Sequence, residues 1–270
     1  MGGLIYGEET ELQDAYVYDI TSAYPNAMSL ATLSFPMEQG TFTKLEKMPE
    51  ILGYGMYRVI IEMSDDKHIN KLFRFNAYNL YSHFDLKIAK VLGLRFTLII
   101  DDEANALLYS SGRQTGSRMF KNLVKYLFKL KQQKVPFVKD IINNLWGVLC
   151  SKNKLKRIAY ADGKIINVED SFILSISPIG GATMVRYCKN NKPFYLYNYA
   201  RIGLFLTSFC RFKLAETLYP IREQVYRFHT DGFITDKEQN FKLGTNLGDW
   251  KLEKRGHCRI NNSMDVEWFN

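Results

Sequence analysis

The spacing of apolar and polar residues divides the chain into strand-like and helix-like segments. Residues 15–19, 57–63 and 95–100 are rich in β-branched and aromatic side chains, which predicts three strands. Two more strands are expected at 225–228 and 233–235, on either side of the tight turn His229-Thr230-Asp231-Gly232.

Helical periodicity is found in several places between these strands. Residues 80–92 and 200–218 predict helices, and a short helix is expected from about Tyr24-Pro25. Residues 117–139 contain seven basic side chains and no acidic one, with basic and apolar residues on opposite faces of a helix. Pro136 suits the first turn of another helix, from 137 to about 149. These two helices form a predicted helical hairpin.

Short strands are expected again after the hairpin. Residues 155–160 and 164–168 flank the turn pair Asp162-Gly163, and residues 184–188 and 194–197 flank the weaker pair Asn190-Asn191. The order of strands, helical hairpin, strands and helix predicts an α+β sheet domain with a helical insertion.

Composition and charge narrow the classes of function. The 270 residues carry a formal net charge of +8, which favours a polyanionic partner without identifying it. No apolar run approaches about 18 residues, and the first residues do not resemble a signal peptide, so no membrane span is expected. The four cysteines are far apart, which makes structural zinc or disulfides unlikely and fits a reducing, intracellular compartment.

Two carboxylates occupy positions at which a cleft site needs acidic groups. Asp19 ends a predicted buried strand, and Tyr24 opens the helix that follows. Asp231 lies at the tip of a predicted hairpin. A hard oxygen ligand on fixed backbone suits a divalent metal ion. Taken singly, each has a simpler interpretation: Asp19 precedes a helix capped by Ser22, and Asp231-Gly232 is an ordinary turn pair.

The second helix of the hairpin places Lys139, Asn143 and Trp146 on one face, because they are three or four residues apart. A lysine, an amide and an aromatic ring can together hold the phosphate, sugar and base of a nucleotide. Read alone, the same pattern describes an amphipathic helix with a solvated lysine and a core tryptophan. On the preceding helix, the basic side chains share one face and repel one another. Such a face is explained if it binds a triphosphate or a nucleic-acid backbone.

Three stretches resemble, in the same order, the polymerase motifs of family B DNA polymerases. The motif Asp-x-x-Ser-Leu-Tyr-Pro is matched by Asp19-Ile20-Thr21-Ser22-Ala23-Tyr24-Pro25. The motif Lys-x-x-x-Asn-Ser-x-Tyr-Gly is matched by Lys139-Asp140-Ile141-Ile142-Asn143-Asn144-Leu145-Trp146-Gly147. The Tyr-x-Asp-Thr-Asp-Ser hairpin is matched by Phe228-His229-Thr230-Asp231-Gly232. Each match is weak, but the ordered set is specific.

Three further matches resemble the protein-primed branch of that family. Its Thr-x-x-Gly/Ala-Arg motif is matched by Thr207-Ser208-Phe209-Cys210-Arg211, and a segment after the last hairpin is matched by Leu247-Gly248-Asp249-Trp250. The end of its Tyr-x-Gly-Gly motif is matched by Gly2-Gly3. The resemblance therefore extends along the whole sequence.

The resemblance implies an α+β polymerase palm, an antiparallel sheet flanked by helices, with a helical-hairpin fingers insertion. The first part of the palm would be residues 1–112 and the fingers 113–151. The second part of the palm would be 152–245, and 246–270 would end the palm or start a truncated thumb. We expect no preceding exonuclease domain and little chain for a thumb.

It also implies a template-directed DNA polymerase core, which transfers a nucleotide from a dNTP to a primer 3′-OH or, at initiation, to a protein hydroxyl. Asp19 and Asp231 would be catalytic and, with the backbone carbonyl of Ile20, would hold two Mg²⁺ ions, with Mn²⁺ as a substitute. The residues implied in nucleotide binding are Tyr24 (the steric gate against a 2′-OH), Ser22, Lys139, Lys131 or Lys134, Asn143 and Trp146. Those implied in DNA contacts are Thr207, Arg211, Thr230, Gly2 and Gly3.

The implied partners are primer–template DNA, dNTPs, a terminal priming protein and a separate chain supplying an exonuclease or thumb. No membrane partner is expected. A viral, phage or linear-plasmid source is suggested, with a location in the host or bacterial cytoplasm or the virion.

The match departs from the family most clearly at His229, which replaces the first Asp of the hairpin. Two alternatives therefore stay open. One is a non-catalytic or partner-dependent nucleic-acid-binding subunit that keeps the palm fold. The other is a primase-like or terminal-transferase-like enzyme, against which Tyr24 argues.

Overall fold

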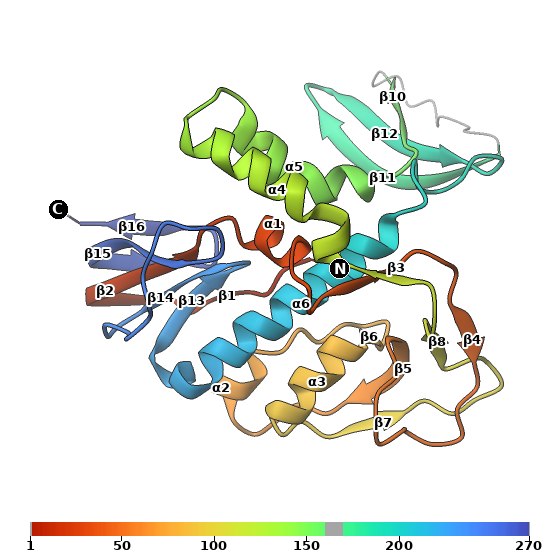
Figure 1. The fold of residues 1–270 in the computed structure, drawn as a ribbon, viewed down its shortest axis with the longest axis horizontal. Coiled ribbons are helices and arrows are strands. Elements are labelled where there is room, and N and C mark those ends of the chain that lie inside the picture. Colours follow the sequence, from red (N-terminus) through yellow and green to blue (C-terminus); the bar gives the residue numbers. More distant parts are fainter. Residues whose placement is uncertain (1, 160–169, 270) are drawn as a thin grey trace. The chain divides into compact units, whose positions relative to one another are not determined.

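The computed structural model describes residues 2–159 and 170–269 and divides the chain into two compact units. The first unit comprises Met1–Asn143 and Leu204–Asn270, and the second comprises Asn144–Gly203. The fold is α+β, as predicted, with antiparallel sheets (Figure 1). No helix in the described part of the chain is long and apolar enough to cross a membrane.

A six-stranded antiparallel sheet forms the palm of the first unit. Its strand order is β1-β13-β14-β2-β15-β16. The strands are β1 (Ile5–Gly7), β2 (Thr10–Ile20), β13 (Val225–His229), β14 (Gly232–Thr235), β15 (Trp250–Ile260) and β16 (Val266–Trp268). Strand β14 lies between β13 and β2, so the turn from β13 to β14 that carries Asp231 is next to the end of β2 that carries Asp19. The closing residues, expected to end the palm or start a thumb, are palm strands.

A second sheet forms from residues that were all expected to belong to the palm. Its order is β4-β8-β5-β6, with β7 also paired to β5, and β3 pairs separately with β9. The strands are β3 (Ser34–Pro36), β4 (Thr41–Thr43), β5 (Gly55–Ile61), β6 (Leu80–Ser82), β7 (Phe96–Leu98), β8 (Ala106–Leu108) and β9 (Arg113–Thr115). The short helix α2 (Lys67–Asn70) and the helix α3 (His83–Val91) follow β5 and β6. Within residues 1–112, only β1 and β2 therefore contribute strands to the six-stranded sheet.

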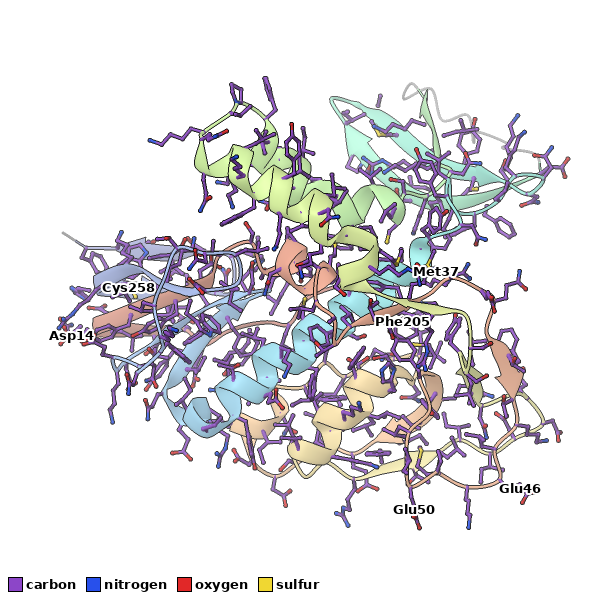
Figure 2. All side chains as sticks on the ribbon, in the orientation of Figure 1. Asp14, Met37, Glu46, Glu50, Phe205 and Cys258 are labelled. Carbon is purple, nitrogen blue, oxygen red and sulfur yellow. The ribbon has the colours of Figure 1, made fainter. Side chains whose placement is uncertain are left out.

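Helix α6 (Ala200–Leu218) lies between the palm sheet and the second sheet in the first unit (Figure 1). Its residues Leu214 and Leu218 share one core with Phe228 of the palm sheet and with Tyr57 of the second sheet. Phe205, labelled in Figure 2, is fully buried on the same helix, and its ring centroid lies 4.6 Å from that of Tyr54. The helix ends in the 3₁₀ turn η1 (Tyr219–Gln224), which leads into β13.

The predicted helical hairpin is confirmed. Helix α4 (Gly116–Gln132) and helix α5 (Val138–Leu149) are joined by a short turn. Leu127 of α4 packs against Val138 and Ile142 of α5, and these side chains are buried. Apolar side chains of the two helices therefore form their interface, and Lys121, Lys125, Lys129 and Lys139 remain exposed.

The second unit contains a three-stranded antiparallel sheet of order β10-β12-β11. Its strands are β10 (Leu155–Ala159), β11 (Ser171–Ile179) and β12 (Ala182–Lys189). Residues 152–199 were expected to be palm, and they lie in this second unit rather than in the unit that holds the six-stranded sheet.

The hairpin predicted at Asn190-Asn191 is wrong. The chain turns instead at Gly180-Gly181, between β11 and β12, where both glycines have positive φ, and β12 pairs with β11. Residues 194–197 are irregular apart from an isolated bridge between Tyr195 and Lys152. The turn predicted at Asp162-Gly163 lies outside the described residues.

Candidate active site

Asp19 and Asp231 are brought together by the pairing of β14 with β2. Gly232 is the register partner of Asp19, and Asp231 precedes it in the turn from β13 to β14. A Cβ atom at Gly232 would lie 3.1 Å from Asp19 Oδ1, so the backbone of Gly232 packs closely against the Asp19 side chain. The two carboxylates predicted from separate motifs thus form one acidic pair.

Burial dominates the electrostatics of this pair. The pKa of Asp231 is raised first by burial and then by the charge of Asp19, although the Thr230 hydroxyl and His229 act in the opposite direction. The pKa of Asp19 is also raised by burial, against the lowering effect of Lys251. Two half-buried carboxylates that disfavour each other's charge are stabilised by a cation between them.

Both carboxylates lie next to strained backbone. Ser22 has φ 52°, although it precedes helix α1 (Ala23–Met28), and Thr230 has φ 62° beside Asp231. A positive φ is costly for a β-branched residue such as Thr230. Such strain persists where the surrounding structure fixes the chain, and it is concentrated at functional sites.

The loop after Asp19 is fixed by the segment Gly248-Asp249. The Thr21 N–H donates to the Asp249 carbonyl and the Gly248 N–H donates to the Thr21 carbonyl, each at 2.9 Å. Gly248 has φ 86°, and a Cβ atom there would lie 2.3 Å from Asn26 Nδ2 of α1. The segment 247–250, which matched the family in sequence, therefore holds the loop that carries Ser22 in place.

The hairpin that carries Asp231 is supported by the N-terminal glycines. A Cβ atom at Gly3 would lie 2.8 Å from Thr230 Cγ2, and the Thr230 N–H donates to the Leu4 carbonyl at 2.9 Å. The carbonyl of Gly3 accepts from Arg74 at 3.1 Å. Gly2, Gly3 and Thr230 thus meet beside Asp231. Their contact with DNA stays a prediction.

Lysines of the hairpin helices reach the same region. Lys131 of α4 donates to Ser22 Oγ at 2.7 Å. Burial lowers the pKa of Lys131, as do the charges of Lys251 and Lys139, whereas Asp19 raises it. The structure therefore brings together Asp19 and the predicted phosphate-binding residues Ser22, Lys131 and Lys139.

Tyr24 lies close to Asp231 in the first turn of α1. Burial raises the pKa of its hydroxyl, and the neighbouring groups include Cys210 and Asp231. A cavity of about 240 Å³ opens beside Asp231 and is lined by residues of α1 and α6, including Cys210. The aromatic ring predicted to act as a steric gate is thus close to the acidic pair.

Three predicted nucleotide-binding residues are placed differently. Lys134 follows α4, is exposed and has a left-handed backbone conformation. Asn143 is exposed on α5. Trp146 belongs to the second unit, where its ring approaches Gly203. The structure thus gives Lys131, rather than Lys134, a place at the acidic pair.

The two residues predicted to touch DNA from α6 are buried. Thr207 donates to the Leu204 carbonyl at 3.2 Å. Arg211 forms a two-pronged ion pair with Asp85, with Nη2 2.8 Å from Oδ1, and donates from Nη1 to the Gly2 carbonyl at 2.6 Å. Arg211 therefore ties α3 and the N-terminal segment to α6, and its contact with DNA stays a prediction.

Sequence reasoning missed Lys251. It follows Trp250 at the start of β15 and is the register partner of Asp19, so its Nζ lies 2.9 Å from Asp19 Oδ2. The same ammonium lies 2.5 Å from Glu253 Oε1. No motif in the sequence identifies this lysine, because its position depends on how β15 pairs with β2.

The donor set fits a hard divalent cation. Two half-buried carboxylates and the Ile20 carbonyl at the end of β2 are oxygen ligands, and Mg²⁺ in phosphate chemistry uses one or two carboxylates while keeping several waters. No group of three or more His, Cys, Asp or Glu suited to a metal occurs within residues 2–159 and 170–269. The remaining ligands would come from water and a phosphate substrate.

The fold is that of a polymerase palm with a fingers hairpin, and solved structures of phi29 DNA polymerase are similar to it. The complex with primer-template DNA (post-translocation binary complex) has a TM-score of 0.64 and 15% identity over 96% of this chain and 47% of that one. The complex with single-stranded DNA has a TM-score of 0.65 and 15% identity over 98% and 47%. The ternary complex with primer-template DNA and incoming nucleotide substrates has a TM-score of 0.61 and 14% identity over 98% and 48%.

This chain thus spans about half the length of the polymerase it matches, and at such identities the likeness establishes the fold alone. No family model and no curated protein matches the sequence.

Proposed function

We propose that this chain catalyses template-directed addition of a deoxynucleotide to a primer 3′-OH, or to a protein hydroxyl at initiation. The observation that carries the proposal is the half-buried acidic pair of Asp19 and Asp231, with Lys131 of the fingers hairpin held beside it at Ser22. The likeness in fold to a DNA polymerase supports it.

In this reaction the 3′-oxygen forms a bond to the α-phosphorus and pyrophosphate leaves. Asp19, Asp231 and the Ile20 carbonyl would hold two Mg²⁺ ions, or Mn²⁺, which neutralise charge on the transferring group when bound. Lys131 and Lys139 contribute fixed positive charge to the triphosphate. Positioning and neutralisation of this kind account for most of the catalysis in phosphoryl transfer.

Tyr24 would select the sugar. Its ring lies near Asp231, so a ribose 2′-OH bound over the acidic pair would meet the ring. Tyr24→Val is expected to admit ribonucleotides while retaining incorporation of deoxynucleotides. Equal discrimination by the variant and the parent in single-nucleotide incorporation would remove Tyr24 from this role.

The test is primer extension by the purified chain on a recessed primer–template with Mg²⁺ and dNTPs. We expect template-dependent addition that is abolished by Asp19→Ala and by Asp231→Asn. Asp14→Asn is the matched control, because Asp14 lies on the same strand as Asp19 but is exposed (Figure 2). Full activity in either site variant would refute the assignment.

A second candidate is a nucleic-acid-binding subunit that keeps the palm but does not catalyse. The ion pair of Lys251 with Asp19 and the presence of His229 favour it, because both alter the acidic pair. It predicts salt-sensitive DNA binding that is indifferent to Mg²⁺ and dNTP. Binding that tightens when both are added would exclude this candidate.

A further inference from the structure

The second unit has a strongly basic composition of its own. It contains nine Lys and Arg and three Asp and Glu, and so accounts for +6 of the chain's net charge of +8. No acidic residue occurs between 171 and 203. The polyanion attraction suggested by the whole sequence is therefore concentrated outside the unit that holds the acidic pair.

Aromatic side chains are exposed within this basic unit. Phe194, Tyr195, Tyr197 and Tyr199 occur within six residues, and each is 40–45% exposed. Large aromatic side chains normally bury most of their surface. Four exposed rings within six residues therefore indicate a binding surface. Phe194, Tyr195 and Tyr197 line an open hollow of about 570 Å³ together with Arg201.

This segment is held in place by its backbone. The Asn153 N–H donates to the Phe194 carbonyl at 2.9 Å, and the Leu196 N–H donates to the Ser151 carbonyl at 2.8 Å. The backbone is thus anchored at alternate residues while the rings remain accessible. The ammonium of Lys152 lies 5.1 Å from the centroid of the Phe194 ring.

We propose that the segment from Lys189 to Arg201 is a binding surface for single-stranded nucleic acid, in which unpaired bases stack on its tyrosines and its basic residues meet the phosphates. Exposed rings interleaved with cations are the combination that single-strand binding uses. A duplex offers no free base faces for stacking, and an acidic protein would have no need of adjacent flat rings. The surface is additional to the proposed catalytic site and uses none of its residues.

The main test measures binding of fluorescein-labelled oligothymidine by fluorescence anisotropy, using the full chain with Asp231→Asn so that no reaction occurs. Tyr197→Leu removes the π face but keeps an apolar side chain, and we expect affinity to fall about fivefold to a hundredfold. The matched control Tyr197→Phe keeps the ring and should bind like the parent. Equal binding by the leucine variant, or a preference for a duplex of the same length, would overturn the proposal.

Two further readouts locate the contact. Lys192→Gln should make the slope of log affinity against log salt shallower by about 0.7, the value for one phosphate contact with a single strand. Photocrosslinking of the unsubstituted chain to oligothymidine that carries 5-iodouracil should label the tyrosines at 195–199, as mapped by mass spectrometry. Adducts confined to the first unit would overturn the proposal even if a variant failed to fold. If the tyrosines are labelled but the unsubstituted chain does not extend a primer, the catalytic proposal is refuted and the single-strand surface is not.

Discussion

The buried ion pair between Arg211 and Asp85 gives the sharpest prediction about this fold. Their side chains are 4% and 6% exposed, and Arg211 Nη2 lies 2.8 Å from Oδ1 and 3.1 Å from Oδ2 of Asp85. Asp85 also accepts from the backbone and hydroxyl of Ser82, at 3.0 and 2.8 Å, in the capping box of α3. Arg211→Ala would leave this carboxylate buried with Ser82 but without its ion-pair partner.

Removing one partner of a buried ion pair costs about 3–5 kcal/mol, because the other charge stays uncompensated. Arg211→Ala should therefore lower the free energy of unfolding by about that amount. Urea unfolding followed by circular dichroism would show a midpoint lower by about 1 M or more. The double variant Asp85→Leu with Arg211→Met removes both charges, and its cost should be far below the sum of the single variants.

The same experiment decides between two roles for Arg211. Its Nη1 donates to the Gly2 carbonyl, so the structural role predicts a less stable protein whose N-terminal segment is released from the hairpin of Asp231. A residue that contacts DNA from the surface predicts unchanged stability and weaker binding to primer–template. Unchanged unfolding of Arg211→Ala with a loss of DNA affinity would refute the structural reasoning.

Three other substitutions test the acidic pair and its support. Gly3→Ala should reduce primer extension at least tenfold without unfolding the protein, because its Cβ would displace Thr230; extension at the parental rate would contradict this packing. Burial raises the pKa of Asp231, so its contribution to stability declines as pH rises above the ordinary Asp range; Asp231→Asn should then raise the melting temperature at pH 7 and change it little at pH 3. Lys251→Met should strengthen Mg²⁺ binding up to about fivefold in isothermal titration calorimetry, since an ammonium is removed from the cation position, and weaker binding would show that Lys251 supports the site.

Much of the first unit could be predicted because its signals are local. The helix at 200–218 matches α6 at both ends, and the strand–turn–strand at 225–235 matches β13 and β14. The first hairpin helix was predicted from its 3.6-residue periodicity, which put Leu127 on the apolar face, and the second from Pro136 in its first turn; Leu127 packs against Val138 and Ile142 of the second helix. The acidic pair could be inferred because each carboxylate ends a segment whose type is encoded locally.

The strand pairing of the second unit could not be predicted in the same way. Asn190-Asn191 and Gly180-Gly181 are both acceptable turn pairs, and the sequence between them suits a strand that pairs on either side. Which neighbour wins depends on side-chain packing across the sheet rather than on the turn itself. The aromatic residues that were expected to pair as a strand instead form the proposed single-strand surface.

Lys251 shows why the last component of the site is hidden in the sequence. Strand β15 follows β2 with register shifts between Leu252 and Lys254 and between Gly256 and Cys258. Because one residue of slip exchanges the two faces of a strand, these shifts determine which side chain meets Asp19. An acidic pair in which one carboxylate already has an ammonium partner holds a divalent cation less tightly than two unpaired carboxylates. The dependence of nucleotide addition on metal concentration, more than DNA binding, is therefore the property that separates a polymerase from a binding subunit with the same palm.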